Sequence, residues 1–310
     1  MPVSPKPRLV VLLGPTGVGK TALALALAHR WQGQIVSADS MQVYRAMDIG
    51  TAKPTLEERR RVPHHLIDVV APDEPFDASR YLALARAAIE SLQAAGKAVF
   101  IVGGTGLYLR ALLGGLIPGP GADEALRRTL KEEMAQRGKR WLHEKLRQQD
   151  ERAAARINPN DGVRVIRALE VLALTGRSIV DCQQEHGFSE QPYEVLKIGL
   201  TLERPRLDER INRRTEGMIE QGFVAEVQAL LERGYGGDLK PMQSLGYRQI
   251  VAHLEGRMGL GEAIGLIQRD TRRYARRQMT WFMADPEIRW LDPDDLATAG
   301  ETVGRFLVRP

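Results

Sequence analysis

The sequence has one cysteine, no long hydrophobic run and only a small excess of positive charge. A single cysteine, Cys182, excludes an internal disulfide and a zinc site built from cysteines, and is typical of a reducing cytoplasm. No apolar run reaches the ~18 residues needed to span a bilayer, so we expect no membrane association. Residues 1–7 lead directly into an apolar segment and leave no room for a signal peptide. We therefore expect a cytoplasmic globular protein.

The charge balance limits the partners without identifying one. Lys and Arg together number 44 and Asp and Glu 39, which gives a formal net charge of +5. Such an excess permits a polyanionic partner such as nucleic acid but does not require it. The length of 310 residues predicts about two domains, or one domain with an insertion.

Residues 14–21 read Gly-Pro-Thr-Gly-Val-Gly-Lys-Thr and match the phosphate-binding pattern G-x-x-x-x-G-K-[S/T]. The apolar segment 9–13 before them predicts a buried strand, and the Ala- and Leu-rich segment 21–30 predicts a helix. Glycines let backbone N–H groups converge on a phosphate at the positive end of that helix. Lys20 would reach an outer phosphate, and the Thr21 hydroxyl would hold Mg²⁺. The predicted diphosphate-binding residues are Gly14, Pro15, Thr16, Gly17, Val18, Gly19, Lys20 and Thr21.

Strand and helix patterns alternate after this loop. Strands are predicted at 34–38 and 98–102 and, more weakly, at 66–69, and a helix capped by Asp77 is predicted through Ala95. This alternation favours an α/β fold, a P-loop-type parallel sheet with helices on both faces. Asp39 and Thr105 follow two of the strands, so both are expected at the sheet edge that carries the phosphate loop.

The pattern changes near the Gly- and Pro-rich segment 114–121. From 122 to about 176 the apolar residues follow a helical period, which predicts an all-helical insertion of about seventy residues. A strand is then predicted at 196–202, helices at 206–220, 224–233 and 261–282, and an edge strand at 288–291. We thus predict a catalytic core from residues 1–120 and 190–310, and a helical domain from 121–189.

The phosphate loop alone does not define a reaction, because kinases, ATPases and GTPases share it. Such proteins usually hold Mg²⁺ with an aspartate at the end of a neighbouring strand. Here the strand 98–102 is followed by Gly-Gly-Thr-Gly, and no Asn-Lys-x-Asp base-reading motif is found. These features weaken the interpretation as an ordinary nucleoside triphosphatase.

Other motifs resemble the bacterial tRNA dimethylallyltransferases, also called tRNA isopentenyltransferases. They occur in order across nearly the whole chain, which makes the resemblance far more specific than the phosphate loop. The matching segments are 14–21, the segment starting at Asp39, 50–54, 63–68, 103–108, 158–161, 167–171, 222–223 and 246–249.

The resemblance implies transfer of a dimethylallyl group. The loop would hold the diphosphate of dimethylallyl diphosphate, which leaves, and the acceptor would be the exocyclic amine of the adenosine just 3′ of the tRNA anticodon. That amine is a poor nucleophile, and Asp39 matches the family's general base. The departing charge would be met by Lys20, Mg²⁺ on Thr21, the Thr105 hydroxyl and an arginine, with Arg214 favoured over Arg210.

A tRNA partner also fits the helix 261–282. Its residues Arg269, Arg272, Arg273, Arg276 and Arg277 fall within an arc of roughly 140°, leaving Ile267, Thr271, Tyr274 and Phe282 for the packed side. Such a face can neutralise phosphates. The resemblance further implies that the helical domain grips the anticodon stem-loop. The tRNA-binding residues that it implies, together with the helix arginines, are Asp39, Ser40, Met41, Gln42, Thr105, Arg127, Val163, Arg164, Val165, Ile166, Arg167, Ser244, Leu245, Gly246, Tyr247, Arg248, Gln249, Arg276 and Arg277.

Structural alternatives remain for several of these residues. Asp39 could cap a turn, the Thr105 hydroxyl could hydrogen-bond to the backbone of a turn, and the arginines could be solvated charges on a helix surface. His64 and His65 suggest a packed or hydrogen-bonded pair rather than a metal site.

Three rival functions also remain. They are a small-molecule kinase with ATP in the loop, an adenylate isopentenyltransferase acting on free nucleotides, and a non-enzymatic RNA-binding module. A helical domain would have nothing to hold in a free nucleotide, which disfavours the second. No protein partner is implied, and we expect a monomer.

Overall fold

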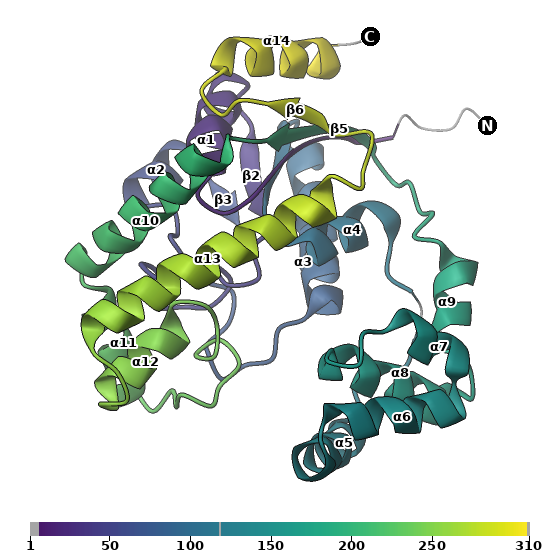
Figure 1. Ribbon diagram of the computed structural model, residues 1–310. Helices are drawn as coiled ribbons and strands as arrows, with labels where there is room; N and C mark the ends of the chain where they lie inside the picture. Colours follow the sequence, from purple (N-terminus) through teal and green to yellow (C-terminus); the bar gives the residue numbers. More distant parts are fainter. Residues whose placement is uncertain (1–5, 118, 309–310) are drawn as a thin grey trace. The chain divides into compact units, whose positions relative to one another are not determined.

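The computed structural model describes residues 6–117 and 119–308 (Figure 1). The expectation of no signal peptide concerns mainly residues 1–5, and the predicted linker includes Pro118; these residues lie outside the described range. The chain divides into two compact units, one formed by residues 1–113 with 191–310 and the other by residues 114–190.

The first unit is built on a parallel sheet of six strands within the described residues, in the order β3-β2-β4-β1-β5-β6 (Figure 1). The strands are β1 (Arg8–Leu13), β2 (Gln34–Ser37), β3 (His64–His65), β4 (Val99–Gly103), β5 (Glu194–Leu200) and β6 (Arg289–Leu291). All neighbouring strands pair in parallel. Five strands, namely β1, β2, β4, β5 and β6, thus lie at or near their predicted positions, with β6 at the sheet edge as predicted.

Helices cover both faces of this sheet. Successive side chains of β1 point to opposite faces, and each set packs against a different group of helices. Leu9 and Leu13 join one buried cluster and Val10 and Leu12 another. The first cluster contains side chains of α3 (Ala78–Ala94), α4 (Gly106–Gly114), α11 (Phe223–Glu232) and α12 (Tyr247–Leu254), with others from α13 (Leu260–Phe282). The second contains side chains of α1 (Lys20–Arg30), α10 (Arg204–Glu220) and α14 (Leu296–Leu307). The predicted α/β fold is confirmed.

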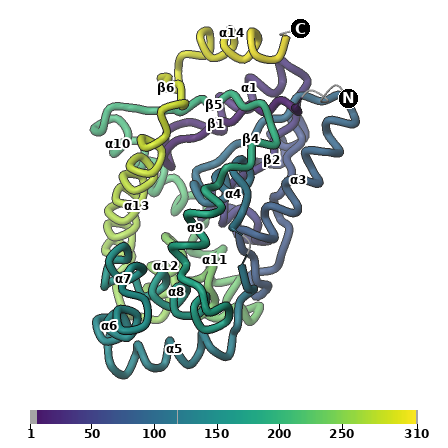
Figure 2. The backbone as a smooth tube through the Cα atoms, turned by 90° about the vertical axis from the view of Figure 1, so that its right-hand side faces the viewer, coloured from purple at the N-terminus to yellow at the C-terminus, as the bar shows by residue number. Residues whose placement is uncertain are grey.

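The last helix, α14, packs beside α1 and buries Ala299, Val303 and Phe306 (Figure 2). Helix α3 begins at its predicted cap, where the Asp77 side chain accepts a hydrogen bond from the Arg80 backbone N–H. Helices α4, α12 and α14, and the short α2 (Leu56–Arg61), lie in segments that no sequence pattern identified. No helix among the described residues is long and apolar enough to cross a membrane.

The weak strand predicted at 66–69 was wrong. Strand β3 lies at His64–His65 instead, and Leu66 and Asp68 have φ values of 62° and 58°, which turn the chain out of the sheet. His64 Nδ1 contacts the Val62 carbonyl at 2.7 Å, and His65 Nε2 contacts Gln34 Oε1 at 2.7 Å. Both histidines are thus hydrogen-bonded, and burial lowers the pKa of each.

The second unit is helical. Its helices are α5 (Glu124–Arg137), α6 (Lys139–Gln149), α7 (Glu151–Arg156), α8 (Gly162–Thr175) and α9 (Ile179–His186). It has its own hydrophobic core, which includes Leu130, Leu142, Leu146, Val165 and Leu169. These residues follow the helical period seen in the sequence.

Candidate active site

The first unit contains a pocket of about 1030 Å³ next to the ends of β1, β2 and β4. Its walls come from segments far apart in the sequence. They include Thr16–Gly17, Gly19–Ala22, Asp39–Gln42, Gly50–Ala52, Gly104, Arg214, Gln243–Arg248 and one face of α13. The phosphate loop and Asp39, which topology predicted at one sheet edge, therefore line the same pocket.

The phosphate loop is shaped by glycines. Gly14 has φ 143°, and a Cβ there would lie 2.6 Å from the Leu200 carbonyl oxygen. Gly19, at φ 111°, is the N-cap residue directly before α1. Lys20 bends over the loop, with Nζ donating to the Gly14 carbonyl at 3.0 Å and to the Pro15 carbonyl at 2.7 Å. Burial lowers the pKa of Lys20 to about 8, although the Asp39 carboxylate acts in the opposite direction.

Asp39 follows β2 and has one oxygen engaged. Its Oδ1 accepts hydrogen bonds from the Met41 N–H at 2.8 Å and the Gln42 N–H at 3.3 Å. The turn-capping role that the sequence left open is therefore present. Within the described part of the chain no hydrogen bond involves Oδ2, so one carboxylate oxygen remains available in the pocket. Capping and proton acceptance can be combined in this side chain.

Thr105 connects the end of β4 to the Asp39 turn. Its Oγ1 accepts from the Ser40 N–H at 3.0 Å, and its own N–H donates to the Ala38 carbonyl at 3.2 Å. The neighbouring Gly104 lines the pocket, whereas Thr105 is not among the lining residues. The backbone role proposed as an alternative for Thr105 is thus present, and its hydroxyl proton can still be donated.

The two candidate arginines of α10 differ in position. Arg214 lines the pocket, and its Nη1 donates to Thr16 Oγ1 at 3.3 Å. Burial lowers the pKa of Arg214, and the nearby Asp39 charge acts against this. Arg210 instead donates to the Val18 carbonyl at 3.1 Å and pairs with Asp294 at 3.3 Å. This geometry favours Arg214 as the cation that meets a ligand in the loop.

A second wall of the pocket is formed by the segment 39–54, of which residues 39–42 and 50–52 line the pocket. This segment is called the acceptor loop below. Gln42 fixes its fold, because its Nε2 donates to the Thr51 carbonyl at 3.4 Å and the Ala52 carbonyl at 3.2 Å. Its Oε1 accepts from the Ser37 hydroxyl at 3.2 Å. The side chain that the resemblance assigned to tRNA contact is therefore engaged within the loop.

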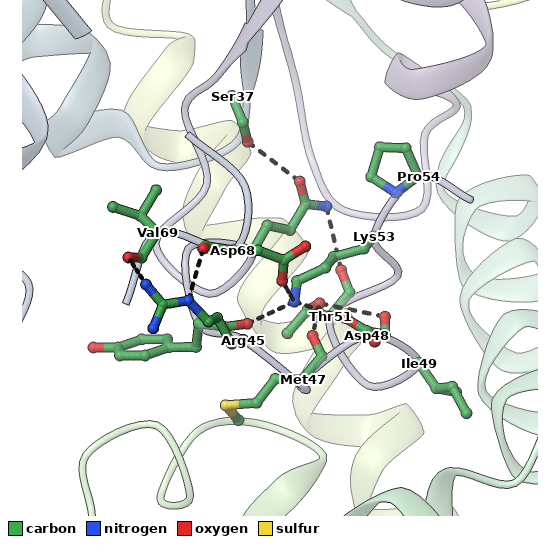
Figure 3. Close-up of polar contacts among 12 residues, drawn as sticks. Ser37, Arg45, Met47, Asp48, Ile49, Thr51, Lys53, Pro54, Asp68 and Val69 are labelled. Atoms are coloured by element: carbon green, nitrogen blue, oxygen red, sulfur yellow. Dashed lines mark hydrogen bonds and ion pairs between the residues drawn. The ribbon is translucent and has the colours of Figure 1, made fainter. Parts of the chain in front are cut away.

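Lys53 lies at the centre of the same network, with its side chain 1% exposed. Its Nζ donates to the Tyr44 carbonyl at 2.6 Å and contacts Asp48 at 2.7 Å and Asp68 at 2.6 Å (Figure 3). Arg59 holds the second Asp68 oxygen at 2.6 Å. Burial alone would raise the pKa of Asp68, but hydrogen bonds from Lys53 and Arg59 outweigh it and lower the pKa.

Glu226 of α11 braces the acceptor loop from outside. Its Oε2 accepts from the N–H groups of Asp48 at 2.8 Å and Ile49 at 2.7 Å. Its Oε1 accepts from the Gly50 N–H at 3.2 Å and the Tyr247 hydroxyl at 2.7 Å. Burial and the Glu226 carboxylate raise the pKa of Tyr247 well above its usual value. No local motif indicated this brace, since Glu226 lies in an ordinary helical pattern.

The arginine face of α13 is partly neutralised. Asp270 contacts Arg248 at 2.9 Å, Arg269 at 3.1 Å and Arg273 at 3.7 Å. Burial alone would raise the pKa of Asp270, but hydrogen bonds from Arg269 and Arg248 lower it. The cationic helix face predicted from the periodicity thus also carries a carboxylate, Asp270, which the prediction did not include.

The remaining side chains of α13 divide between core and pocket. Ile267 and Phe282 are buried as predicted, and Ile267 also borders the pocket. Thr271 and Tyr274, assigned to the packed side, line the pocket as well. Arg276 and Arg277 are exposed, and Arg277 lies 5.7 Å from the centre of the Tyr274 ring. Arg272, by contrast, donates to Asn212.

The residues of segment 244–249 differ in burial and in whether they line the pocket. Residues 244–248 line the pocket, but Tyr247 and Gln249 are buried. The Gln249 amide accepts from the Gly246 N–H at 2.9 Å and donates to Asp270 at 3.1 Å. Both side chains therefore hold the pocket wall together in this structure.

In the helical unit several implied tRNA-binding side chains are internal. Val165 and Ile166 are 0% and 6% exposed, so their side chains face the unit's core and are not available for RNA contact. Arg127 holds the buried Glu170 through two hydrogen bonds of 2.8 and 3.0 Å, and Arg167 contacts the same carboxylate. Burial would raise the pKa of Glu170, but these hydrogen bonds lower it. Of the predicted segment 163–167, Val163 and Arg164 are exposed.

A glycine-shaped phosphate loop at the carboxyl ends of a parallel sheet, with a carboxylate in the same pocket, defines a P-loop-type α/β protein. The model of a family described as IPP transferase matches residues 42–285. The chain belongs to this family.

Relatives and solved structures are similar over almost the whole chain. It is 58% identical over 302 residues to tRNA dimethylallyltransferase 2 of Syntrophus aciditrophicus, covering 97% of each. A tRNA isopentenylpyrophosphate transferase from Bacillus halodurans has a TM-score of 0.73 and 41% identity, with 97% of both chains covered. A eukaryotic dimethylallyltransferase described as acting on tRNA has a TM-score of 0.81 and 28% identity, covering 98% of this chain and 80% of that one.

Proposed function

We propose that the chain transfers a dimethylallyl group from dimethylallyl diphosphate to the exocyclic amine of the adenosine 3′ of the anticodon in tRNA. It is an enzyme of the tRNA dimethylallyltransferase type, as its relatives at 50–58% identity are named. The observation that supports this reaction best is that the phosphate loop and Asp39 line one pocket. Such a pocket can hold the leaving group of one substrate and the nucleophile of the other.

In this reaction the adenine nitrogen forms a bond to the first carbon of the dimethylallyl group as the carbon–oxygen bond to diphosphate breaks. The amine becomes acidic during attack, and the available Oδ2 of Asp39 accepts its proton. The contacts from Met41 and Gln42 to Oδ1 hold the carboxylate in place for this step.

Cations balance the charge of the departing diphosphate. Lys20 exchanges its contacts with the Gly14 and Pro15 carbonyls for phosphate oxygens, and Arg214, which lines the pocket, adds a second cation. Thr105 does not line the pocket, but its hydroxyl proton can still be donated, and we assign it to the same charge. The Thr21 hydroxyl lines the pocket and fits Mg²⁺, which commonly takes one or two protein oxygens together with phosphate oxygens and water. Bound there, Mg²⁺ would neutralise part of the diphosphate charge.

The tRNA is bound through ion pairs with its phosphates and through a target base that is extruded into the pocket. Arg276 and Arg277 are exposed on α13, and we assign them to phosphate contacts. Loop bases of RNA can be unstacked at modest cost, which brings the adenine to Asp39. We assign the anticodon stem-loop to the helical unit, where exposed Val163 and Arg164 offer contacts. We further propose that the enzyme is a monomer and that it is cytoplasmic. The free cysteine, Cys182, is in keeping with a cytoplasmic location.

A labelling experiment tests the proposal. Radiolabelled dimethylallyl diphosphate and Mg²⁺ are incubated with unmodified tRNA, with free AMP, or with a tRNA carrying inosine at the target position. Inosine lacks the exocyclic amine, so label is expected on unmodified tRNA alone. Label on AMP would indicate the free-nucleotide reaction instead. In a parallel incubation with labelled ATP, phosphate transfer in the absence of prenylation would indicate a kinase.

A further inference from the structure

Asp270 of α13 lies where two helices meet, and both of its carboxylate oxygens are engaged. Oδ2 accepts from Arg248 Nη2 at 2.9 Å and from Gln249 Nε2 at 3.1 Å, and both of these donors belong to α12. Oδ1 accepts from Arg269 Nε at 3.1 Å and lies 3.7 Å from Arg273 Nη1, and both of these arginines belong to α13. One carboxylate therefore joins α12 to α13 and gathers three guanidinium groups.

These three guanidinium groups face the pocket and remain accessible. The Asp270 side chain is 15% exposed, whereas the three arginine side chains are 48–59% exposed. All four residues line the pocket that also contains Asp39. Within the described part of the chain, no other residue forms a hydrogen bond or ion pair with these guanidinium groups. Their remaining N–H groups can therefore bind an anion at the pocket.

The carboxylate has two opposing effects on anion binding. Three positive charges and one negative charge leave a net charge of +2, so Asp270 lowers the attraction for an anion. The three guanidinium groups also repel one another, and free arginine side chains lose rotamer freedom when they bind. Asp270 offsets the repulsion and orders the side chains before a ligand arrives, which lowers the entropy cost of binding.

The same carboxylate supports the wall of the pocket at the start of α12. Gln249 is 4% exposed, and its Nε2 is held by Asp270. Its Oε1 accepts from the Gly246 N–H at 2.9 Å, directly before the helix. The position of Arg248 is thus fixed both by its own contact with Asp270 and through its neighbour in the chain.

We propose that Asp270 is a positioning residue that holds Arg248, Arg269 and Arg273 in place for the RNA phosphates next to the extruded base. This inference rests on the proposed tRNA substrate. It predicts an effect opposite in sign to that of net charge. If Asp270 were only a counter-charge, its removal would strengthen the binding of every RNA, whereas loss of a positioning residue weakens the binding of the substrate.

The test measures the affinity of two RNAs by fluorescence anisotropy at one salt concentration. One is an unmodified anticodon stem-loop with the target adenosine, and the other is a paired RNA duplex with the same number of phosphates. The duplex cannot readily extrude a base, so net charge governs its binding. In Asp270→Asn we expect the affinity for the stem-loop to fall about tenfold. The affinity for the duplex is expected to rise about twofold, because the variant gains one unit of positive charge.

Two further variants separate position from charge. Glu262→Gln is the matched control, since Glu262 is an exposed acid on the same helix, outside the pocket. It adds the same charge, and we expect it to change the affinities for both RNAs alike. Asp270→Glu keeps the carboxylate, and we expect it to recover most of the affinity for the stem-loop.

The outcomes distinguish the possible roles of Asp270. Tighter binding of both RNAs by Asp270→Asn would show that Asp270 is only a counter-charge. Equal weakening of both RNAs would show a purely structural contact between α12 and α13. Either result would overturn the inference while leaving the proposed function intact. If the unaltered chain does not prenylate the stem-loop, the proposed function fails and this inference fails with it.

Discussion

The two walls of the pocket are built in different ways. The phosphate loop is one continuous segment, and its shape depends on glycine conformations and a helix N-terminus. The acceptor loop is shaped by side chains: Gln42 and Lys53 donate to carbonyls inside it, and Glu226 of α11 accepts from its backbone N–H groups. A ligand that needs only backbone donors can be held by a short motif, whereas the acceptor loop, which we propose orients a nucleobase, depends on contacts from distant residues. The predictions below test this difference.

The largest effect is expected from Asp39→Asn. The amide oxygen can still accept from the Met41 and Gln42 N–H groups, so the turn is kept while the proton acceptor is lost. We expect single-turnover prenylation of tRNA to fall by about 10²- to 10⁴-fold. Pyrophosphate affinity, measured by calorimetry, should change little because the phosphate loop is intact. A variant that prenylates at an undiminished rate would show that Asp39 only caps the turn.

Charge reversal of both Arg276 and Arg277 to glutamate should come next. We expect tRNA affinity at low salt to fall by about 10- to 100-fold, with a smaller dependence on salt, because phosphate contacts are lost. Binding of dimethylallyl diphosphate should weaken much less, because the phosphate loop is intact even though Arg277 lines the pocket. Arg305→Glu on α14 is the control, since Arg305 pairs with Glu301 on a helix that does not line the pocket. Equal losses in the control and the double variant would argue against a specific surface.

Glu226→Gln should act on the acceptor wall alone. The amide cannot accept all four hydrogen bonds that the carboxylate receives, so residues 48–50 loosen. We expect the KM for tRNA to rise about tenfold, with the KM for dimethylallyl diphosphate unchanged. Glu232→Gln, an exposed change on the same helix, should alter neither value. A parallel rise in both KM values would contradict the separation of the two walls.

The smallest effect concerns pH and the phosphate wall. Burial places the pKa of Lys20 at about 8, below its ordinary value, so the free protein loses this charge as the pH rises through that value. Pyrophosphate affinity should therefore weaken by roughly three- to tenfold between about pH 7 and pH 10. Lys20→Arg keeps its charge, and its affinity profile isolates the lysine from the ionisation of pyrophosphate itself. Identical profiles for the two proteins would refute this assignment.

The same difference explains what the sequence could predict. The phosphate loop, the strands around it and the Asp77 cap depend on local patterns, and the structure has them where expected. The structural roles of Glu226, which holds the acceptor loop, and of Gln278, which contacts the Thr16 N–H and the Gly104 carbonyl, could not be predicted. In the sequence a polar residue on a helix with tertiary contacts looks the same as a solvated one. The sequence favoured Arg214 over Arg210, which lies one helical turn away, but only the contacts of the two side chains separate their positions.

The errors have similar causes. Leu66 and Val69 suggested a strand, but Asp68 is drawn into the contacts of Lys53 and Arg59 and the chain turns there. The resemblance implied tRNA contacts for Val165 and Ile166, but both side chains lie on the buried side of α8. A motif identifies a segment, whereas the packing decides which of its side chains are accessible.

The most direct test of the account is a crystal structure of the chain with a non-hydrolysable analogue of dimethylallyl diphosphate. We expect Lys20 to leave the Gly14 and Pro15 carbonyls and contact the diphosphate, with the reacting carbon directed toward Asp39. An analogue bound elsewhere, with Lys20 still on those carbonyls, would contradict the claim that this loop holds the leaving group.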